Sequence, residues 1–274
     1  MNEPLKILIT NYWLQSRSGS EVVVRDVALG MLSRGHQPTV YAPYLAAPAE
    51  ELRSRGVRVI DDLAELVDPP QIIHGHHNIP TVEALARFPV CPAIWVCHDR
   101  RAWHDEPPRF QRIYQYIGIG DESCDRILRA GIAPDRITLL RNAVDLARIP
   151  PRPEELPDRP RHALAFSKTA GQMPFLEDAC RQLGLLFAAI GLGAERLVEY
   201  PERELVRYDL VFATARCAIE AMCAGSAVVV CDARGLGEMV TTANFERLRD
   251  HNFSWDALSR PVTVKAVIRS SSAS

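Results

Sequence analysis

Short apolar runs alternate with longer amphipathic segments along most of this chain. The apolar runs have the length of strands, and the segments between them repeat apolar residues at helical spacing. Strands are predicted at residues 5–10, 39–42, 72–74, 93–97, 115–119, 137–140, 163–166, 185–190 and 209–213, and helices at 21–34, 121–130 and 175–183. Such alternation is typical of α/β folds with doubly wound parallel sheets.

The segment from Cys217 to Val240 shows this pattern most densely. Apolar residues at helical spacing are followed by Gly225, which is expected to end the helix in the left-handed conformation, and then by an apolar run at 227–231. Gly235 and Gly237 come directly after that run. We therefore expect a glycine turn and a new helix at the carboxyl end of the strand, where backbone amides can bind a phosphate.

Glu220 is a single acid within this apolar helix. A buried carboxylate without a partner costs free energy, so its side chain is expected either to face solvent or to reach a ligand hydroxyl. Glu220, Ala221 and Met222, followed by the hydrophobic strand and the Gly235-x-x-Glu238 pattern, resemble the nucleotide-sugar-binding unit of GT-B glycosyltransferases of family 4, the "group 1" transferases. The resemblance extends along most of the chain, with an abbreviated C-terminal third.

The resemblance implies two Rossmann-like doubly wound domains that face each other across a cleft, the second one shortened. We expect an acceptor-side domain at 1–148 and a nucleotide-sugar-binding domain at 162–274. The proline-rich and charged stretch at 149–161 is predicted to be a stiff, solvated linker. The serine-rich end, 268–274, is predicted to be either disordered or an addition to the native sequence, and no family-type crossover helix is recognisable after Trp255.

Composition narrows the classes of partner. With 274 residues, 47% hydrophobic content and a net charge of −2, the chain can bury a sizeable core and gives no electrostatic reason to expect nucleic-acid binding. The composition is also compatible with peripheral contact between the protein and a membrane. Several of the seven cysteines fall in predicted strands or helices, which favours reduced thiols. The absence of a signal-like or spanning apolar run leads us to expect a cytoplasmic protein.

The loop Ser16–Ser20 follows the first predicted strand. In the family, a glycine-bearing loop at this place lines the cleft, so the resemblance implies that Gly19 and Ser20 approach a ligand. The alternative is an ordinary turn in which Ser18 or Ser20 caps the helix.

His98 and Asp99 end the predicted strand at 93–97, at the edge of the sheet where α/β proteins bind ligands. The resemblance implies that His98 is the catalytic histidine near the reacting sugar, with Asp99 on the acceptor side. A strand-end histidine that caps a carbonyl is the alternative, and Trp103 and His104 are competitors for the role.

His74, His76 and His77 also suggest a metal site. Neighbouring histidines on a strand point to opposite faces, and this short cluster does not supply the further ligands that a metal needs. The family generally needs no bound metal, so we expect no metal and no cofactor other than the nucleotide-sugar co-substrate. Asn142–Asp145 resembles the family's Asn-Gly-Val-Asp hinge, which is also a simple turn.

Donor contacts are implied in the second domain. Ser167 and Lys168 follow its first strand, where the family carries a cation for the donor diphosphate, and a lone lysine is otherwise a solvated loop residue. The amides near Cys217 and Ala218 are expected at the diphosphate, and Glu220 at the nucleotide ribose.

One family feature is missing. The family has another glutamate, which acts at the sugar and is separated from the ribose-binding one by seven intervening residues, and Phe212 stands at that place here. The resemblance therefore implies a retaining glycosyltransferase of the hexosyltransferase type with low activity, acting on an unknown acceptor. The alternatives are a non-catalytic or weakly active nucleotide-sugar-binding protein of the same fold, and another sugar-nucleotide enzyme such as an epimerase.

Overall fold

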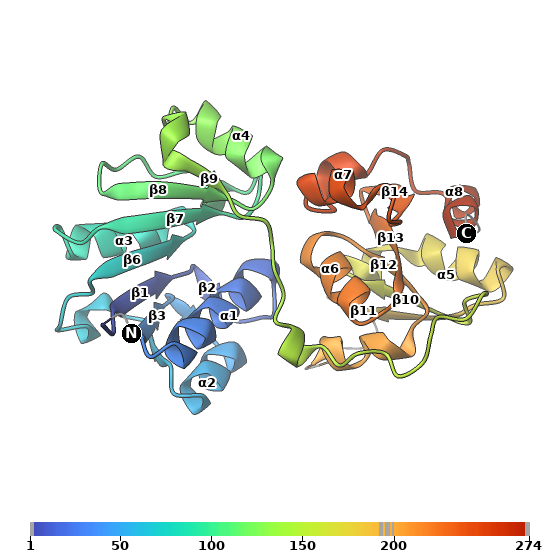
Figure 1. The fold of residues 1–274 in the computed structure, drawn as a ribbon, viewed down its shortest axis with the longest axis horizontal. Helices are drawn as coiled ribbons and strands as arrows, with labels where there is room; N and C mark the ends of the chain where they lie inside the picture. The colour runs from blue at the N-terminus through green and yellow to red at the C-terminus, as the bar shows by residue number, and fades with distance from the viewer. Residues whose placement is uncertain (1–2, 192–193, 195–197, 199, 272–274) are drawn as a thin grey trace. The chain divides into compact units, whose positions relative to one another are not determined.

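The computed structural model describes residues 3–191, 194, 198 and 200–271. The chain divides into two units, Met1–Arg141 and Asn142–Ser274, and each has its own sheet (Figure 1). The predicted α/β class with two Rossmann-like units is confirmed. The first unit ends at Arg141 rather than at the expected residue 148, so the hinge-like segment that begins at Asn142 belongs to the second unit.

Unit 1 contains a parallel sheet with strand order β5-β3-β1-β6-β7-β8-β9. The strands are β1 Lys6–Thr10, β3 Gln37–Tyr41, β5 Arg58–Ile60, β6 Ile72–His76, β7 Ala93–Cys97, β8 Ile113–Gly118 and β9 Ile137–Leu139, with a small ladder between β2 Trp13–Leu14 and β4 Tyr44–Leu45. The helices are α1 Gly19–Ser33, α2 Ala47–Ser54, α3 Asn78–Arg87 and α4 Asp121–Arg129. The sheet therefore has the topology that the alternating pattern predicts.

Both faces of this sheet are buried, because successive side chains of a strand point to opposite sides. Ile7 and Ile9 pack with α1 and α2 in one apolar cluster, whereas Leu8 packs with α3 and α4 in another. Strand order reverses between β1 and β6, which is the switch point where open α/β sheets leave a crevice at the carboxyl ends of their strands. The fold thus places the residues after Thr10 and His76 at the ligand-binding edge of unit 1.

Unit 2 has the strand order β11-β10-β12-β13-β14. The elements are β10 His162–Phe166, α5 Pro174–Gln182, β11 Leu186–Ile190, β12 Leu210–Ala213, α6 Ala215–Cys223, β13 Ala227–Asp232, β14 Gly235–Met239, α7 Phe245–Asp250 and α8 Val264–Ser271. Strand order reverses between β10 and β12, so the switch point of this sheet lies at Ser167 and Thr214.

The expected helix after the Gly235 turn was wrong. The residues from Gly235 form β14, which pairs antiparallel with β13 and closes the edge of the sheet. Gly237 is needed there because a Cβ atom at this position would lie 2.4 Å from the carbonyl oxygen of Ala257. The glycines therefore permit a close approach of backbone, and they do not open a phosphate-binding turn.

The helix and strand around Gly225 are confirmed. Gly225 has a φ of +88°, the left-handed conformation that ends α6 before β13 begins. Phe212 is fully buried in β12 and packs with residues of α5 and α8. The tail predicted to be disordered continues as α8 up to Ser271, and residues 272–274 lie outside the described part.

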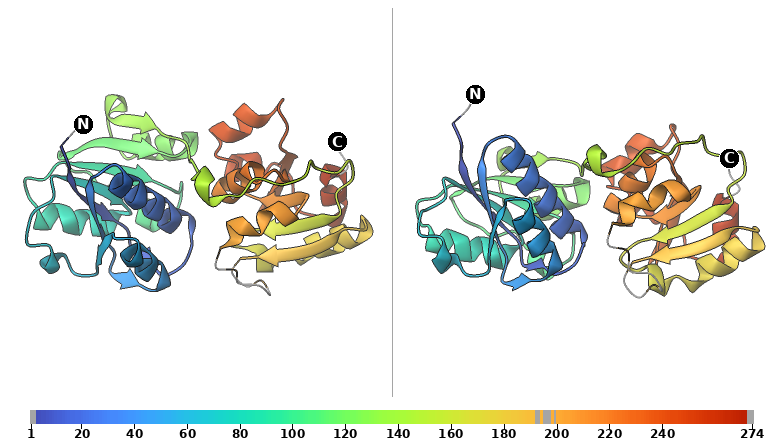
Figure 2. Two further views of the ribbon diagram at one scale, coloured as in Figure 1. Left: turned by 60° about the horizontal axis from the view of Figure 1, so that its bottom comes forward. Right: turned by 90° about the horizontal axis from the view of Figure 1, so that it is seen from below.

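The proline-rich segment is attached to unit 2 rather than solvated throughout. It runs along the outside of this unit to β10 (Figure 2). Ile149 is buried in the unit 2 core, and Arg152 Nη1 donates to the carbonyl oxygen of Tyr208 at 2.9 Å. Asp209 Oδ2 accepts the amide hydrogens of Arg161 and His162 at 2.7 and 3.0 Å. Both ends of the expected linker are therefore held against unit 2 by these contacts.

No helix in the described part of the chain is long and apolar enough to cross a membrane. All seven cysteines are free thiols, as their positions in strands and helices predict.

Candidate functional site

The loop before α1 is organised by one buried acid. Glu21 Oε2 accepts the Ser18 amide hydrogen at 2.9 Å and the Ser16 hydroxyl at 2.6 Å, and Oε1 accepts the amide hydrogens of Gln15 and Ser16. The predicted Ser18 N-cap is confirmed. A Cβ atom at exposed Gly19 would meet no atom of the chain within 4 Å, so packing does not demand a glycine here. Gly19 and the adjoining Ser20 therefore leave backbone open to a ligand.

His98 lies directly after β7, at the carboxyl edge of the unit 1 sheet. Its Nε2 is 2.6 Å from Nδ1 of His76, and its amide donates to Oδ1 of Asp105 at 3.0 Å. Burial, followed by the neighbouring histidines, lowers the pKa of His76 well below its usual value. The neutral His76 ring is hydrogen-bonded to His98 and therefore fixes the orientation of the half-buried His98 side chain.

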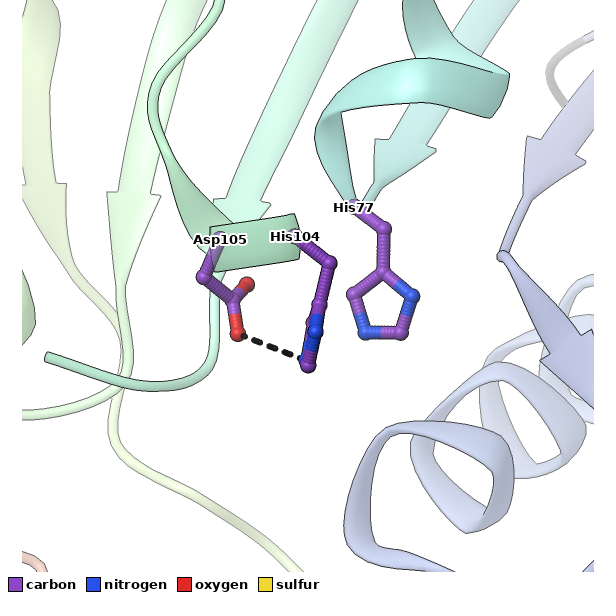
Figure 3. Close-up of side chains that lie close together, drawn as sticks. All are labelled: His77, His104 and Asp105. Atoms are coloured by element: carbon purple, nitrogen blue, oxygen red, sulfur yellow. Dashed lines mark ion pairs between the residues drawn. The ribbon is translucent and has the colours of Figure 1, made fainter. Parts of the chain in front are cut away.

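His77, His104 and Asp105 lie side by side near His98 (Figure 3). Their ligand atoms are all within 4.8 Å of one another, and His104 Nε2 lies 3.7 Å from Asp105 Oδ2. His77 is not set up as a metal ligand, however. Burial lowers its pKa to about 2, so the ring is neutral, and its Nδ1 accepts the amide hydrogen of Tyr12. The ring proton then sits on the other nitrogen, the one that faces His104.

Asp105 is the buried acid of this group, at 1% exposure. Burial raises the pKa of its carboxyl to about 7 against the opposing effect of the His98 amide. Near neutral pH the carboxyl that supports the turn after His98 is therefore present in both its neutral and its charged form.

Aromatic rings surround this edge of unit 1. The ring centroid of Tyr12 lies 4.4, 5.4 and 5.5 Å from those of Trp13, Tyr44 and Trp103. Trp103 is 55% exposed and Tyr44 47% exposed. Large aromatic surface in contact with solvent beside His77 and His104 is suited to bind the apolar face of a small ligand.

Asp99 and Asn142 have structural partners. Asp99 Oδ1 accepts the amide hydrogens of Arg101 and Ala102, which closes a turn after His98. Asn142 lies in unit 2, where its side-chain amide donates to Asn252 at 3.0 Å. Neither contact tests a role at an acceptor, and those roles stay predictions.

Ser167 and Lys168 lie at the switch point of unit 2. Ser167 is buried, and its hydroxyl accepts the Thr169 amide hydrogen at 3.0 Å, which shapes the turn after β10. Lys168 is exposed, and no ion pair of its ammonium is found within the described residues. The position leaves a mobile positive charge at the carboxyl edge of the sheet.

The N-terminus of α6 lies beside this turn in the sheet order. Thr214 is the N-cap, and the Ala218 amide donates to the Thr214 carbonyl at 3.4 Å. The amide of Cys217 belongs to the first turn, whose hydrogens have no acceptor within the helix. The Cys217 amide is therefore better placed to bind an anion than the Ala218 amide.

Glu220 corrects the expectation drawn from its isolation in the helix. Its side chain is buried and already has two partners in the protein, because Oε1 accepts hydrogen bonds from Arg148 Nη2 at 3.2 Å and Arg216 Nε at 3.1 Å. Arg148 also pairs with the buried Glu202 at 3.2 Å, and Arg216 donates to the Ala143 carbonyl. Burial raises the pKa of Glu220 although both arginines oppose that shift.

These four side chains form a buried ion-pair chain that joins α6 to the start of unit 2. Sequence reasoning missed it, together with Glu21 and the Asp209 contacts. Arg216 could have been found, because it stands four residues before Glu220 on the same helix face. Arg148 is 72 residues away from Glu220, and no local pattern connects them.

Residues 17–148 match the model of the family described as Glycosyltransferase Family 4. No curated protein sequence matches the chain. The chain is similar to a glycosyltransferase from Rickettsia africae ESF-5, with a TM-score of 0.62 and 12% identity over 83% of this chain and 79% of that one.

Two further solved structures are similar. HepE from Anabaena, in a complex with UDP and glucose, gives a TM-score of 0.61 at 15% identity over 97% of each chain. WaaG, a glycosyltransferase involved in lipopolysaccharide biosynthesis, gives 0.56 at 13% identity over 81% of this chain and 80% of that one. Residues 17–148 thus resemble glycosyltransferase family 4, and the similar solved structures show that the fold of the chain is that of GT-B proteins. The suspected resemblance is thereby confirmed, and the family match supports a glycosyltransferase.

Proposed function

We propose that this GT-B protein transfers a sugar from a nucleotide-diphospho-sugar donor to an acceptor, with retention of configuration. The observation that carries the proposal is the position of His98. It follows β7 at the ligand-binding edge of the unit that matches family 4, and its ring is oriented by His76 at 2.6 Å.

Unit 2 supplies the proposed donor contacts. Lys168 would neutralise the diphosphate, Ser167 would shape the turn that carries it, and the Cys217 amide at the start of α6 would donate to a phosphate oxygen. With this cation and these amides, the leaving diphosphate is stabilised without a metal ion. A ribose hydroxyl would have to reach Glu220 alongside two arginines, so a direct ribose contact remains a prediction.

A nucleotide-sugar-binding protein with little or no turnover is the second candidate. Phe212 is buried in the core, and only Thr214 separates β12 from α6. The chain therefore has no loop there that could carry the acid which the family places at the sugar. This favours slow transfer even when the donor binds.

Release of nucleoside diphosphate tests the proposal. UDP-glucose is the first donor to use, because it is bound in a structure of HepE, and other nucleotide sugars follow. Slow release that is lost in His98→Ala, with donor affinity retained, is expected for the enzyme. Donor binding without release from any donor and acceptor tried would support the binding protein instead.

Lys168→Ala separates the donor contacts from the general fold. The variant should weaken binding of UDP more than that of uridine, and added salt should shrink the difference. Equal losses for both ligands would contradict the diphosphate role, and Lys265→Ala on the exposed surface of α8 provides the control.

A further inference from the structure

Four aromatic residues of unit 1 gather at the carboxyl edge of its sheet, and together they are named the aromatic platform. Tyr12 and Trp13 follow β1, Tyr44 follows β3, and Trp103 lies in the segment after β7. The strands β3, β1, β6 and β7 are consecutive in the sheet. Three segments that are distant in the sequence therefore build one surface beside the switch point between β1 and β6.

The backbone of the platform is held in place by the protein itself. The side-chain amide of Asn11 donates to the Trp13 carbonyl at 2.7 Å, and that of Asn78 donates to the Trp103 carbonyl at 3.0 Å. Trp13 also pairs with Tyr44 in the ladder between β2 and β4. A surface that is ordered before a ligand arrives loses less conformational freedom on binding.

Trp103 leaves much of its ring uncovered. Its ring stands nearly perpendicular to those of Tyr12, Trp13 and His104, at interplanar angles of 85°, 82° and 88°. None of these three neighbours stacks in parallel on it, and the residue is 55% exposed. Tyr44 is exposed as well. The platform therefore offers flat aromatic surface to a ring whose C–H groups lie on one face.

The polar groups of the platform fit a neutral, hydroxylated ligand. The pKa of the Tyr12 hydroxyl is raised, most of all by a side-chain hydrogen bond with Tyr44 and further by the negative charge of Glu83. Both hydroxyls thus stay protonated and can donate and accept hydrogen bonds. Because the charge that acts on Tyr12 is negative, an anionic ligand would be repelled. A lipid chain would use the rings and leave the hydroxyls without a partner.

We propose that the aromatic platform binds a neutral pyranose ring of the acceptor, with Trp103 and Tyr44 as the residues that contact its apolar face. That this sugar is the acceptor rests on the proposed function. His77 connects the platform to His98, because its ring centroid lies 5.6 Å from that of Trp13 and 6.2 Å from that of His98. The acceptor class is therefore a neutral saccharide or glycoside.

Binding of methyl β-D-glucopyranoside and of cellobiose to the full chain, without donor, tests the proposal by saturation-transfer difference NMR. Trp103→Ala and Tyr44→Ala should each raise the dissociation constant at least fivefold, whereas Trp103→Phe should raise it less because an aromatic face remains. Tyr114→Ala is the matched control, since Tyr114 is also an exposed tyrosine of unit 1, in β8. Glucose 6-phosphate should bind more weakly than the methyl glucoside.

Each result decides the assignment independently of sugar transfer. Loss of sugar binding in the platform variants alone, with unchanged thermal unfolding, supports it even if no donor is ever turned over. No binding of either sugar, or an equal loss in Tyr114→Ala, overturns it, while diphosphate release by the wild type would leave the proposed function intact. Tighter binding of glucose 6-phosphate overturns the neutral class. Binding to phosphatidylcholine vesicles that depends on Trp103, without sugar binding, overturns the proposal in favour of a membrane surface.

Discussion

Replacing Glu220 with glutamine separates a structural role of this acid from a direct contact with the donor. The side chain is 6% exposed and accepts hydrogen bonds from Arg148 and Arg216 through one oxygen. Glutamine keeps the shape and one neutral acceptor, but it removes the negative charge. Both arginines then lose this buried negative partner, while Arg148 keeps its pair with Glu202.

Two magnitudes bound the expected loss of stability. Hydrogen bonds to charged groups contribute about 1.5–3 kcal/mol each, and removal of one partner from a buried ion pair costs about 3–5 kcal/mol. The raised pKa of Glu220 shows that burial already disfavours its charged form, which lowers the expected loss. We therefore expect Glu220→Gln to reduce the free energy of unfolding by about 2 kcal/mol.

Urea denaturation followed by fluorescence measures this difference, with Glu246→Gln on the exposed face of α7 as the control. The control should stay within about 0.5 kcal/mol of the wild type, as surface substitutions do. The reasoning fails if Glu220→Gln is as stable as the control. If UDP affinity falls tenfold at the same time, the carboxylate is a ribose ligand rather than part of the fold.

Three further substitutions test other parts of the structure. Burial raises the pKa of Asp209, but the Arg161 and His162 amides and then Arg152 outweigh burial and lower the pKa overall, so the charged form stabilises the folded chain above pH 3.8 and this stabilisation is lost as the pH falls below that value. Asp209→Asn should therefore have a lower free energy of unfolding than the wild type at pH 7, and the difference should narrow below pH 3.8. A difference that stays constant with pH would contradict the ionic role of Asp209. His76→Ala should lower the rate of diphosphate release at least tenfold with donor affinity unchanged, whereas His76→Gln should retain more activity. Equal rates in the wild type and both variants would show that His76 does not orient His98. Phe212→Glu places a charge in a fully buried position, so we expect it to unfold the chain or to destabilise it by more than about 3 kcal/mol rather than to restore catalysis. Thermal unfolding measures this loss. A variant as stable as the wild type would contradict the position of Phe212 in the core.

Most strands of both sheets could be predicted because they are continuous apolar runs, which a strand buried on both faces requires, but the short edge strand β5 was not among the predicted ones. The edge strand β14 could not. Its sequence, Gly-Leu-Gly-Glu-Met, has the glycine spacing of a phosphate-binding turn, and its pairing depends on β13 and on Leu258 and Arg260 packed beside it. Local sequence does not show such neighbours.

For the candidate site, the sequence predicted the positions of several residues but not their partners. His98, Ser167 and Lys168 follow apolar strands, so their place at the carboxyl edge could be derived from the chain alone. Their partners could not, because His76 and His98 meet only when β6 and β7 pair. The isolated Glu220 was the most misleading residue, since its partner Arg148 lies in a segment expected to end the first domain.

The anchoring of residues 142–161 determines where the chain can be divided. A C-terminal fragment that begins at His162 would lack Arg148 and Arg152, and so would remove one of the two arginine partners of Glu220 and the arginine partner of Asp209. A fragment that begins at Asn142 keeps these contacts and the buried Ile149. Expression of the second half as an independent protein should therefore succeed from Asn142 and fail from His162, although the proline-rich stretch between them is the more obvious place to cut.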